Sequence, residues 1–155
     1  MPRIVISDTI CLILLHKIEE IELLKRIYKE IITTPEVAEE FSEPLPGWIK
    51  IESVKDKKYQ ELLETQVDLG EASAMALAKE IKDPLLLLDD LKARKLAKKL
   101  NLTFTGVLGV LNKAKQIGII NKIKPLIDKL LLTNFRISQN IIDELLKINN
   151  EYSNQ

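Results

Sequence analysis

Short apolar runs alternate with longer amphipathic segments along this chain, and that alternation predicts strands followed by helices. The clearest run is residues 85–88, four leucines that follow Asp83 and Pro84. A run of this length is too short for a free-standing helix and is typical of a strand buried on both faces. Similar runs predict four further strands, of which 48–51 alternates and suits a sheet edge: residues 4–8, 31–33, 48–51 and 102–105.

Apolar residues at helical spacing occupy the intervals between these strands. The segment after Asp90 buries one face, made of Ala93, Leu96, Ala97 and Leu100. Thr34 and Pro35 open another helix as N-cap and first helical residue, and it ends before Pro44. The other predicted helices are residues 9–17, 19–29, 55–66, 72–81, 106–116, 121–132 and, capped by Ser138, 138–148.

Strands that alternate with helices predict an α/β fold with a mainly parallel sheet. The chain has 155 residues, which suffices for one domain with a substantial core. No internal repeat, low-complexity run or long linker divides it. We therefore expect residues 1–148 to form a single domain and the polar residues 149–155 to form a frayed tail.

Composition excludes several classes of function. Lys+Arg and Asp+Glu each number 23, so no global charge directs the protein to nucleic acid. The single cysteine, Cys11, excludes an internal disulfide and a cysteine-rich zinc site, and the single histidine, His16, excludes multi-histidine metal sites and histidine triads. No apolar run reaches membrane-spanning length and no signal peptide is visible, so we expect a cytoplasmic protein without a membrane partner.

Acidic residues stand where the predicted strands end and the helices begin. Asp8 follows the first strand, Asp89 and Asp90 follow the leucine strand, and Glu71 lies at the start of a helix. Ligands of open parallel sheets bind beyond the carboxyl ends of the strands. Each acid also has a structural interpretation: Asp8 and one of Asp89 and Asp90 as helix caps, and Glu71 in a capping box with Asp68.

A further acid comes from the helix that Pro35 opens. Val37 and Phe41 are one turn apart and define its inward stripe. At about 100° per residue, Glu40 lies on the flank of that stripe, whereas Glu39 points roughly opposite. Glu40 is therefore the better candidate for a site, with a solvated surface acid as the alternative.

Clustered carboxylates imply a cation. Like charges that crowd together are unfavourable unless a positive charge compensates them. Carboxylates without histidine or cysteine ligands select a hard cation such as Mg²⁺ or Mn²⁺. Such a centre suits phosphodiester hydrolysis, because a metal can polarise the phosphate, activate water and stabilise the leaving oxygen.

The acidic motifs, in this order, resemble those of the PIN domains, a family of metal-dependent ribonucleases that includes the VapC-type toxins. The resemblance covers nearly the whole chain, and its closing part is similar to a subgroup described as predicted nucleic-acid-binding proteins that contain a PIN domain. The matching segments are VISDT (5–9), PEVAEE (35–40), LGEASA (69–74), LLDDLKAR (87–94), TGVLGVL (105–111) and the stretch from GII (118–120) to FRIS (135–138).

The resemblance implies an α/β/α sandwich with an acidic pocket for one or two Mg²⁺ or Mn²⁺ ions. It implies Asp8 as a ligand with Thr9 beside it, and catalytic or metal-binding roles for Glu40, for Glu71 and for Asp89 or Asp90. Many members have Thr or Ser two positions before the last acid, where this chain has leucine, so the choice between Asp89 and Asp90 stays open.

The functional hypothesis is a metal-dependent endoribonuclease that hydrolyses RNA, acting as the toxin of a toxin–antitoxin pair, with an antitoxin protein as partner and a homodimeric assembly. Lys92, Arg94 and Lys95 are candidates for contacts with the RNA backbone, although a solvated helix face is the commoner reason for such a pattern. The alternative is a non-catalytic PIN-like module that binds RNA or protein. A receiver-type phosphoacceptor domain ranks last, because no second acid accompanies Asp8 at the end of the first strand.

Overall fold

The computed structural model describes residues 3–153 and contains a five-stranded, all-parallel sheet. The strand order is β3-β2-β1-β4-β5. The chain proceeds outward from β1 to β2 and β3, then crosses back to β4 on the other side of β1 and continues to β5. The point where the order reverses lies between β1 and β4, which is where ligands bind in open α/β sheets. The strands are β1 (Ile4–Ser7), β2 (Glu30–Thr33), β3 (Ile49–Ile51), β4 (Leu85–Leu87) and β5 (Phe104–Thr105).

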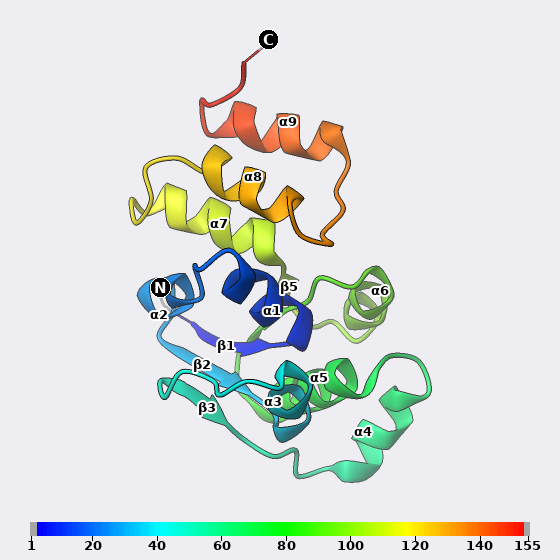
Figure 1. Ribbon diagram of the computed structural model, residues 1–155. Coiled ribbons are helices and arrows are strands. Elements are labelled where there is room, and N and C mark those ends of the chain that lie inside the picture. Colours follow the sequence, from blue (N-terminus) through cyan, green and yellow to red (C-terminus); the bar gives the residue numbers. More distant parts are fainter. Residues whose placement is uncertain (1–2, 154–155) are drawn as a thin grey trace.

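Helices cover both faces of the sheet, which confirms the α/β/α sandwich (Figure 1). Alternate strand residues face opposite layers: Val5 and Ile31 pack with α1, α2 and α7, whereas Ile6 and Ile32 pack with α4, α5 and α6. The helices are α1 (Thr9–Lys17), α2 (Glu22–Ile27), α3 (Pro35–Phe41), α4 (Lys57–Glu64), α5 (Leu69–Glu80), α6 (Leu91–Lys99), α7 (Val107–Gln116), α8 (Lys124–Leu131) and α9 (Gln139–Ile148).

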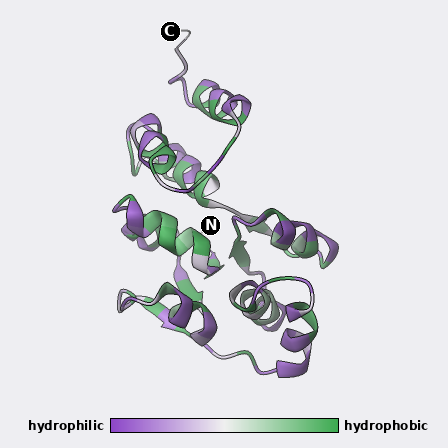
Figure 2. Cartoon of the chain, turned by 45° about the vertical axis from the view of Figure 1, so that its right-hand side comes forward, coloured by the Kyte–Doolittle hydropathy of each residue, from purple (hydrophilic) through white to green (hydrophobic). Residues whose placement is uncertain are grey.

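The hydropathy of each helix follows its place in these layers. Figure 2 shows α1 as hydrophobic over most of its surface, consistent with Leu12 and Leu15 being fully buried. Helices α8 and α9 stack outward from α7 and extend the molecule beyond the sheet (Figure 1). Among residues 3–153 there is no helix with both the length and the apolar character that a membrane span requires.

Side-chain caps fix where the helices near the strand ends begin. Asp8 accepts a hydrogen bond from the Cys11 N–H at 2.9 Å and starts α1 directly after β1. Thr34 accepts from the Val37 N–H at 3.1 Å and starts α3 directly after β2. These caps satisfy N–H groups that the first helical turn leaves without partners. The chain reversals after β1 and β2 are therefore set by a polar residue that follows the strand.

Three predicted helices are clearly shorter in the structure. The helix expected over 55–66 covers only Lys57–Glu64. The helix expected over 19–29 covers only Glu22–Ile27, because Glu19 adopts a left-handed conformation with φ of 61°. The helix expected over 121–132 begins at Lys124, with Pro125 in its first turn. Neither of the latter two changes moves a predicted core position to the surface, since Leu24 and Ile127 remain buried.

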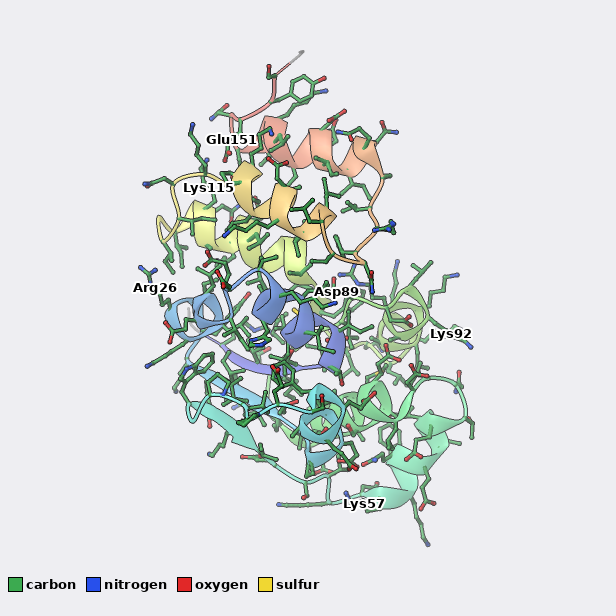
Figure 3. All side chains as sticks on the ribbon, viewed as in Figure 1. Arg26, Lys57, Asp89, Lys92, Lys115 and Glu151 are labelled. Carbon is green, nitrogen blue, oxygen red and sulfur yellow. The ribbon has the colours of Figure 1, made fainter. Side chains whose placement is uncertain are left out.

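The expected fraying from residue 149 is wrong for the first residues of the tail. Asn149 is buried, and its amide donates to Asn112 Oδ1 at 2.8 Å. The Glu151 carboxylate accepts from the backbone N–H groups of Ile123 and Lys124 at 2.8 and 3.0 Å and from Lys115 Nζ at 2.6 Å (Figure 3). These contacts attach the chain after α9 to α7 and α8. Of the predicted tail, residues 154–155 lie outside the described residues.

We predict that Glu151→Ala lowers the free energy of unfolding by about 1–3 kcal/mol, because it removes the carboxylate that pairs with Lys115 and leaves two N–H groups at the start of α8 without their acceptor. Chemical denaturation measures the loss. Glu144→Ala is the control, since Glu144 is exposed and lies 3.8 Å from Lys147 in a surface pair. Equal, small effects from both substitutions would show that the contacts of Glu151 do not hold the tail.

Candidate functional site

Asp8 is the most enclosed acid of the site. Its side chain lies at the carboxyl end of β1 and is fully buried. Oδ1 accepts from the Cys11 N–H, and Oδ2 accepts from the Asp89 N–H at 3.3 Å. Burial raises the pKa of Asp8 to about 8. The charges of Asp89 and Glu71 also raise this pKa, whereas the hydrogen bonds from the Cys11 and Asp89 N–H groups lower it by less than burial raises it. Among the residues that the structure describes, Asp8 forms no ion pair that would neutralise its charge.

Asp89 lies beside Asp8 at the end of β4 but in a different electrostatic setting. Its carboxylate accepts from the Val107 N–H, the first of α7, at 3.0 and 3.1 Å, and it lies 3.7 Å from Arg94 Nη2 (Figure 3). Burial raises the pKa of Asp89, while Val107, Arg94 and the Cys11 thiol act in the opposite direction. The side chain is only 5% exposed. Asp89 is therefore a buried carboxylate that has a cationic partner.

Glu71 and Asp90 form a second pair, in the first turns of α5 and α6. Asp90 caps α6 by accepting from the Ala93 N–H at 2.9 Å, and Glu71 Oε1 accepts from the Asp68 N–H at 3.2 Å in the predicted capping box. Burial raises the pKa of Glu71 to about 7, and the charge of Asp90 is the next cause. Both acids line a polar hollow of about 280 Å³ together with Lys92.

Glu40 reaches the site from the last turn of α3. Its Oε1 accepts at 3.0 Å from the hydroxyl of Thr9, the residue that follows Asp8. The charge of Glu40 also contributes to the raised pKa of Glu71. Gly70 lies against the pair of Glu40 and Thr9, since a Cβ there would overlap Glu40 Oε1 and come within 2.9 Å of Thr9 Oγ1. The absence of a side chain at Gly70 is therefore what allows α5 to approach the pair.

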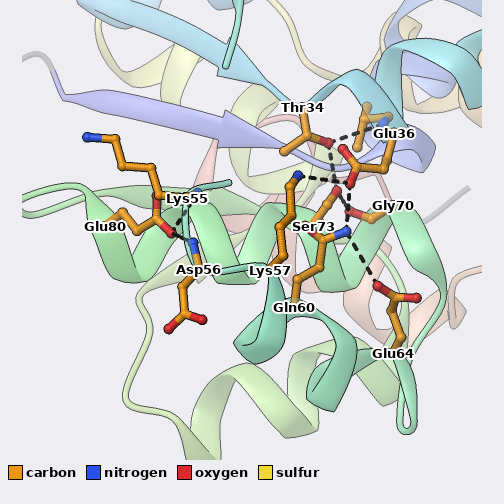
Figure 4. Close-up of polar contacts among 11 residues, drawn as sticks. Thr34, Glu36, Lys55, Asp56, Lys57, Gln60, Glu64, Gly70, Ser73 and Glu80 are labelled. Carbon is orange, nitrogen blue, oxygen red and sulfur yellow. Dashed lines mark hydrogen bonds and ion pairs between the residues drawn. The ribbon is translucent and has the colours of Figure 1, made fainter. Parts of the chain in front are cut away.

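A buried hydroxyl network holds α3 against α5. Thr34 Oγ1 and Ser73 Oγ are 2.6 Å apart, and Ser73 Oγ donates to the Gly70 carbonyl at 2.8 Å (Figure 4). Because Thr34 also caps α3, its hydroxyl links the start of that helix to the first turn of α5. The network fixes the relative position of the two helices that carry Glu40 and Glu71.

The structure brings all the predicted acids into one group. Asp8 contacts Asp89 through a backbone hydrogen bond, and electrostatic interactions link Asp8 to Glu71 and Glu71 to Asp90 and Glu40. Asp8, Asp90 and Glu71 also have the expected capping roles, and Asp89 accepts from the first N–H of α7, whereas Glu40 accepts from the Thr9 hydroxyl. As expected, Val37 and Phe41 are buried. Glu39 and Glu40 are both exposed, and the contact with Thr9 is what distinguishes Glu40.

The predicted basic residues lie in three different surroundings. Arg94 turns inward: its Nε donates to the Leu88 carbonyl at 2.6 Å and its guanidinium lies over the ring of Phe104. Lys92 lines the hollow of Glu71 and Asp90, and Lys95 lines a neighbouring surface hollow. Sequence reasoning missed the pairing of Arg94 with Asp89, and the five-residue separation between them carried no recognisable spacing signal.

The donor chemistry of the group suits Mg²⁺ or Mn²⁺, because every side chain in it offers hard oxygen atoms. Yet within residues 3–153 no three Asp, Glu, His or Cys side chains are arranged so that they could hold a metal ion. The oxygens instead accept hydrogen bonds from Cys11, Asp68, Ala93, Val107 and Thr9. Metal binding would therefore require some of these carboxylates to turn from their present donors.

Comparison with protein families supports the resemblance drawn from the motifs. A family model described as a PIN domain matches residues 4–151. That range includes every acid of the group and all the strands and helices of the structure. A search of curated proteins finds no match to the chain.

We predict that the metal-free protein loses stability as the pH rises from about 4 to about 8. Asp8 has a pKa of about 8 in the fold, against about 3.9 when unfolded, so across this interval the folded state binds more protons than the unfolded state. Stability is therefore greatest below the unfolded pKa and falls until the pH passes the folded one. Melting in EDTA should show a decrease of about 4 °C or more.

Asp8→Asn is expected to flatten that pH profile, because asparagine retains an acceptor for the Cys11 N–H but carries no charge. Asp128→Asn, on the exposed face of α8, is the control and should keep the slope of the wild type. A wild-type profile without any decline would contradict the assignment of Asp8 as an uncompensated buried acid.

Proposed function

The chain belongs to the PIN-domain family, and we propose that it is an endoribonuclease that hydrolyses RNA phosphodiester bonds with Mg²⁺ or Mn²⁺. PIN domains are generally nucleases. The observation that carries the proposal is the pair Asp8 and Glu71, whose pKa values rise to about 8 and about 7 because burial and neighbouring acids leave their charge uncompensated. A divalent cation would supply the missing positive charge.

We assign metal binding to Asp8, Glu71, Asp90 and Glu40, the acids that electrostatic interactions link and that form no ion pair within residues 3–153. Asp89 differs from them, since it has a cationic partner in Arg94, 3.7 Å away, and accepts from the Val107 N–H. We therefore assign Asp89 a positioning role: its N–H orients Asp8 and its carboxylate holds the start of α7. This assignment decides between Asp89 and Asp90 in favour of Asp90 as the ligand.

A bound cation at this centre would polarise the phosphate and activate water for hydrolysis. The chain's own contribution is to orient the acids. The backbone donors of Cys11 and Asp89 hold Asp8 in one position, and the Thr9 hydroxyl holds Glu40. Lys92, on the wall of the hollow beside Glu71, supplies a positive charge for a substrate phosphate.

We further propose that the protein is the toxin of a toxin–antitoxin pair, acting as a homodimer that an antitoxin protein inhibits. The likeness of its motifs to those of VapC-type toxins supports this role. A short reading frame directly upstream that overlaps this gene, and whose product suppresses RNA cleavage in a purified mixture, is the expected finding. An isolated gene whose overexpression leaves growth unchanged would contradict the toxin role and leave the nuclease proposal intact.

We predict that the wild type cleaves single-stranded RNA with Mn²⁺ and that Asp8→Asn reduces the rate by at least about 100-fold, because the substitution removes the charge that binds the cation. Gel analysis of labelled RNA measures the rate, and Asp128→Asn is the control that should cleave normally. Calorimetry with Mn²⁺ is run in parallel. Confirmed metal binding without cleavage of any RNA would favour a non-catalytic module that binds RNA or protein.

Glu40→Gln and Glu39→Gln provide a test matched in charge, since each removes one unit at adjacent positions. We expect Glu40→Gln to weaken Mn²⁺ binding and to lower cleavage by about tenfold or more, because Glu40 contacts Thr9 beside Asp8. Glu39→Gln should change both little, and its effect on stability should stay within about 0.5 kcal/mol. Equal losses would indicate that only long-range charge matters, and a reversed order would exclude Glu40 from the site.

A further inference from the structure

A second hollow lies beside Asp89. None of its lining residues also lines the hollow of Glu71 and Asp90. The second hollow measures about 580 Å³ and lies between α6, the start of α7 and the segment before α9. This volume is within the range of small-ligand pockets. Its lining includes Asp89, Arg94, Phe104, Phe135, Arg136 and Ile141, and we call it the Arg94–Arg136 pocket. Asp89 lines this pocket and also belongs to the acidic group, so the pocket adjoins that group.

The lining combines aromatic rings with positive charge. The guanidinium of Arg94 lies 5.5 Å from the centre of the Phe104 ring, and Phe135 contributes a second, half-buried ring. Arg136 is exposed, and its Nη1 donates only to the backbone carbonyls of Thr133 and Phe135, each at 3.1 Å. Asp89, already paired with Arg94, is the one acid among the lining residues. The pocket therefore presents flat apolar surface and an arginine without an acidic partner in the part of the chain that the structure describes.

Two glycines in the lining of this pocket allow neighbouring side chains to approach the backbone closely. A Cβ at Gly106 would overlap Arg94 and the Asp89 carboxylate, and one at Gly109 would overlap the Thr105 hydroxyl. Gly106 has an extended backbone, with φ of −134°, so what requires glycine there is space and not an unusual conformation. Both residues line the pocket.

We propose that the Arg94–Arg136 pocket binds one nucleobase of single-stranded RNA, with Arg136 on an adjoining phosphate, and so selects which nucleotide flanks the bond that is cut. The inference rests on the proposed ribonuclease function and adds to it the position that reads the substrate. Aromatic rings and arginine side chains are the groups on which unpaired bases stack. The unpaired charge of Arg136 complements a phosphate, whereas an apolar peptide would offer that charge no partner.

Matched variants test the pocket through RNA binding in EDTA, where no cleavage takes place. Arg136→Ala and Phe135→Leu should each weaken binding of a short fluorescent single-stranded RNA about tenfold, a usual loss for one stacked base. Arg26→Ala removes the same charge from an exposed position on α2 and should change binding less than about twofold. Melting curves identify any variant that loses its fold, and the conservative Phe135→Leu retains most of the apolar volume.

A series of RNAs that each lack one base locates the contact. We expect one position beside the cleaved bond to account for about tenfold in binding, and we expect that position to lose its importance in Arg136→Ala and Phe135→Leu. If every position contributes equally, or if both variants bind RNA like the wild type, the proposal is overturned. The pocket then remains a candidate surface for a protein partner.

Titration with mononucleotides separates this inference from the proposed function. Saturable chemical-shift changes at the amides of Gly106, Gly109 and Phe135 on adding nucleoside monophosphates would support the pocket even if the protein cuts no RNA. RNA cleavage without any such changes would support the nuclease and overturn the nucleobase pocket.

Discussion

The acidic group of this protein is arranged around one buried carboxylate, that of Asp8. Asp8 ends the central strand β1, has no exposed surface, and has backbone N–H groups as its hydrogen-bond donors. Arg94 is paired with Asp89, 3.7 Å away. The reversal of strand order between β1 and β4 creates this edge, and the end of α3, the first turn of α5 and the N-cap of α6 bring Glu40, Glu71 and Asp90 to it. The fold thus maintains a concentration of negative charge whose cost a cation would relieve.

Helix capping and the acidic group are two uses of the same side chains. Asp8, Asp90 and Glu71 each satisfy N–H groups at a helix start, a role generally associated with about 1 kcal/mol. The caps also fix the direction of each carboxylate. That is why side chains from three helices converge, and why the hydrogen bonds that orient them compete with metal coordination.

Features set by short-range spacing could be predicted from the sequence. The leucines of β4, the Thr34 cap and the flank position of Glu40 beside Val37 follow from strand and helix periods, and the structure agrees. Polar pairings that depend on the tertiary structure could not be predicted. Arg94 belongs to a basic helix yet turns toward Asp89, and Glu151 is polar yet anchors the chain after α9. Such contacts depend on the tertiary positions of α7 and α8 and leave no local pattern.

The central claim is that a cation binds between Asp8 and the facing acids, and crystals soaked with Mn²⁺ test it directly through anomalous scattering. The account predicts a peak coordinated by Asp8 together with Glu71 or Asp90, with Glu40 turned toward it and with Asp89 still bound to Arg94 and Val107. Diffraction from such crystals with no peak at the ends of β1 and β4, or with the ion held by Asp89 in place of Asp90, would contradict the account.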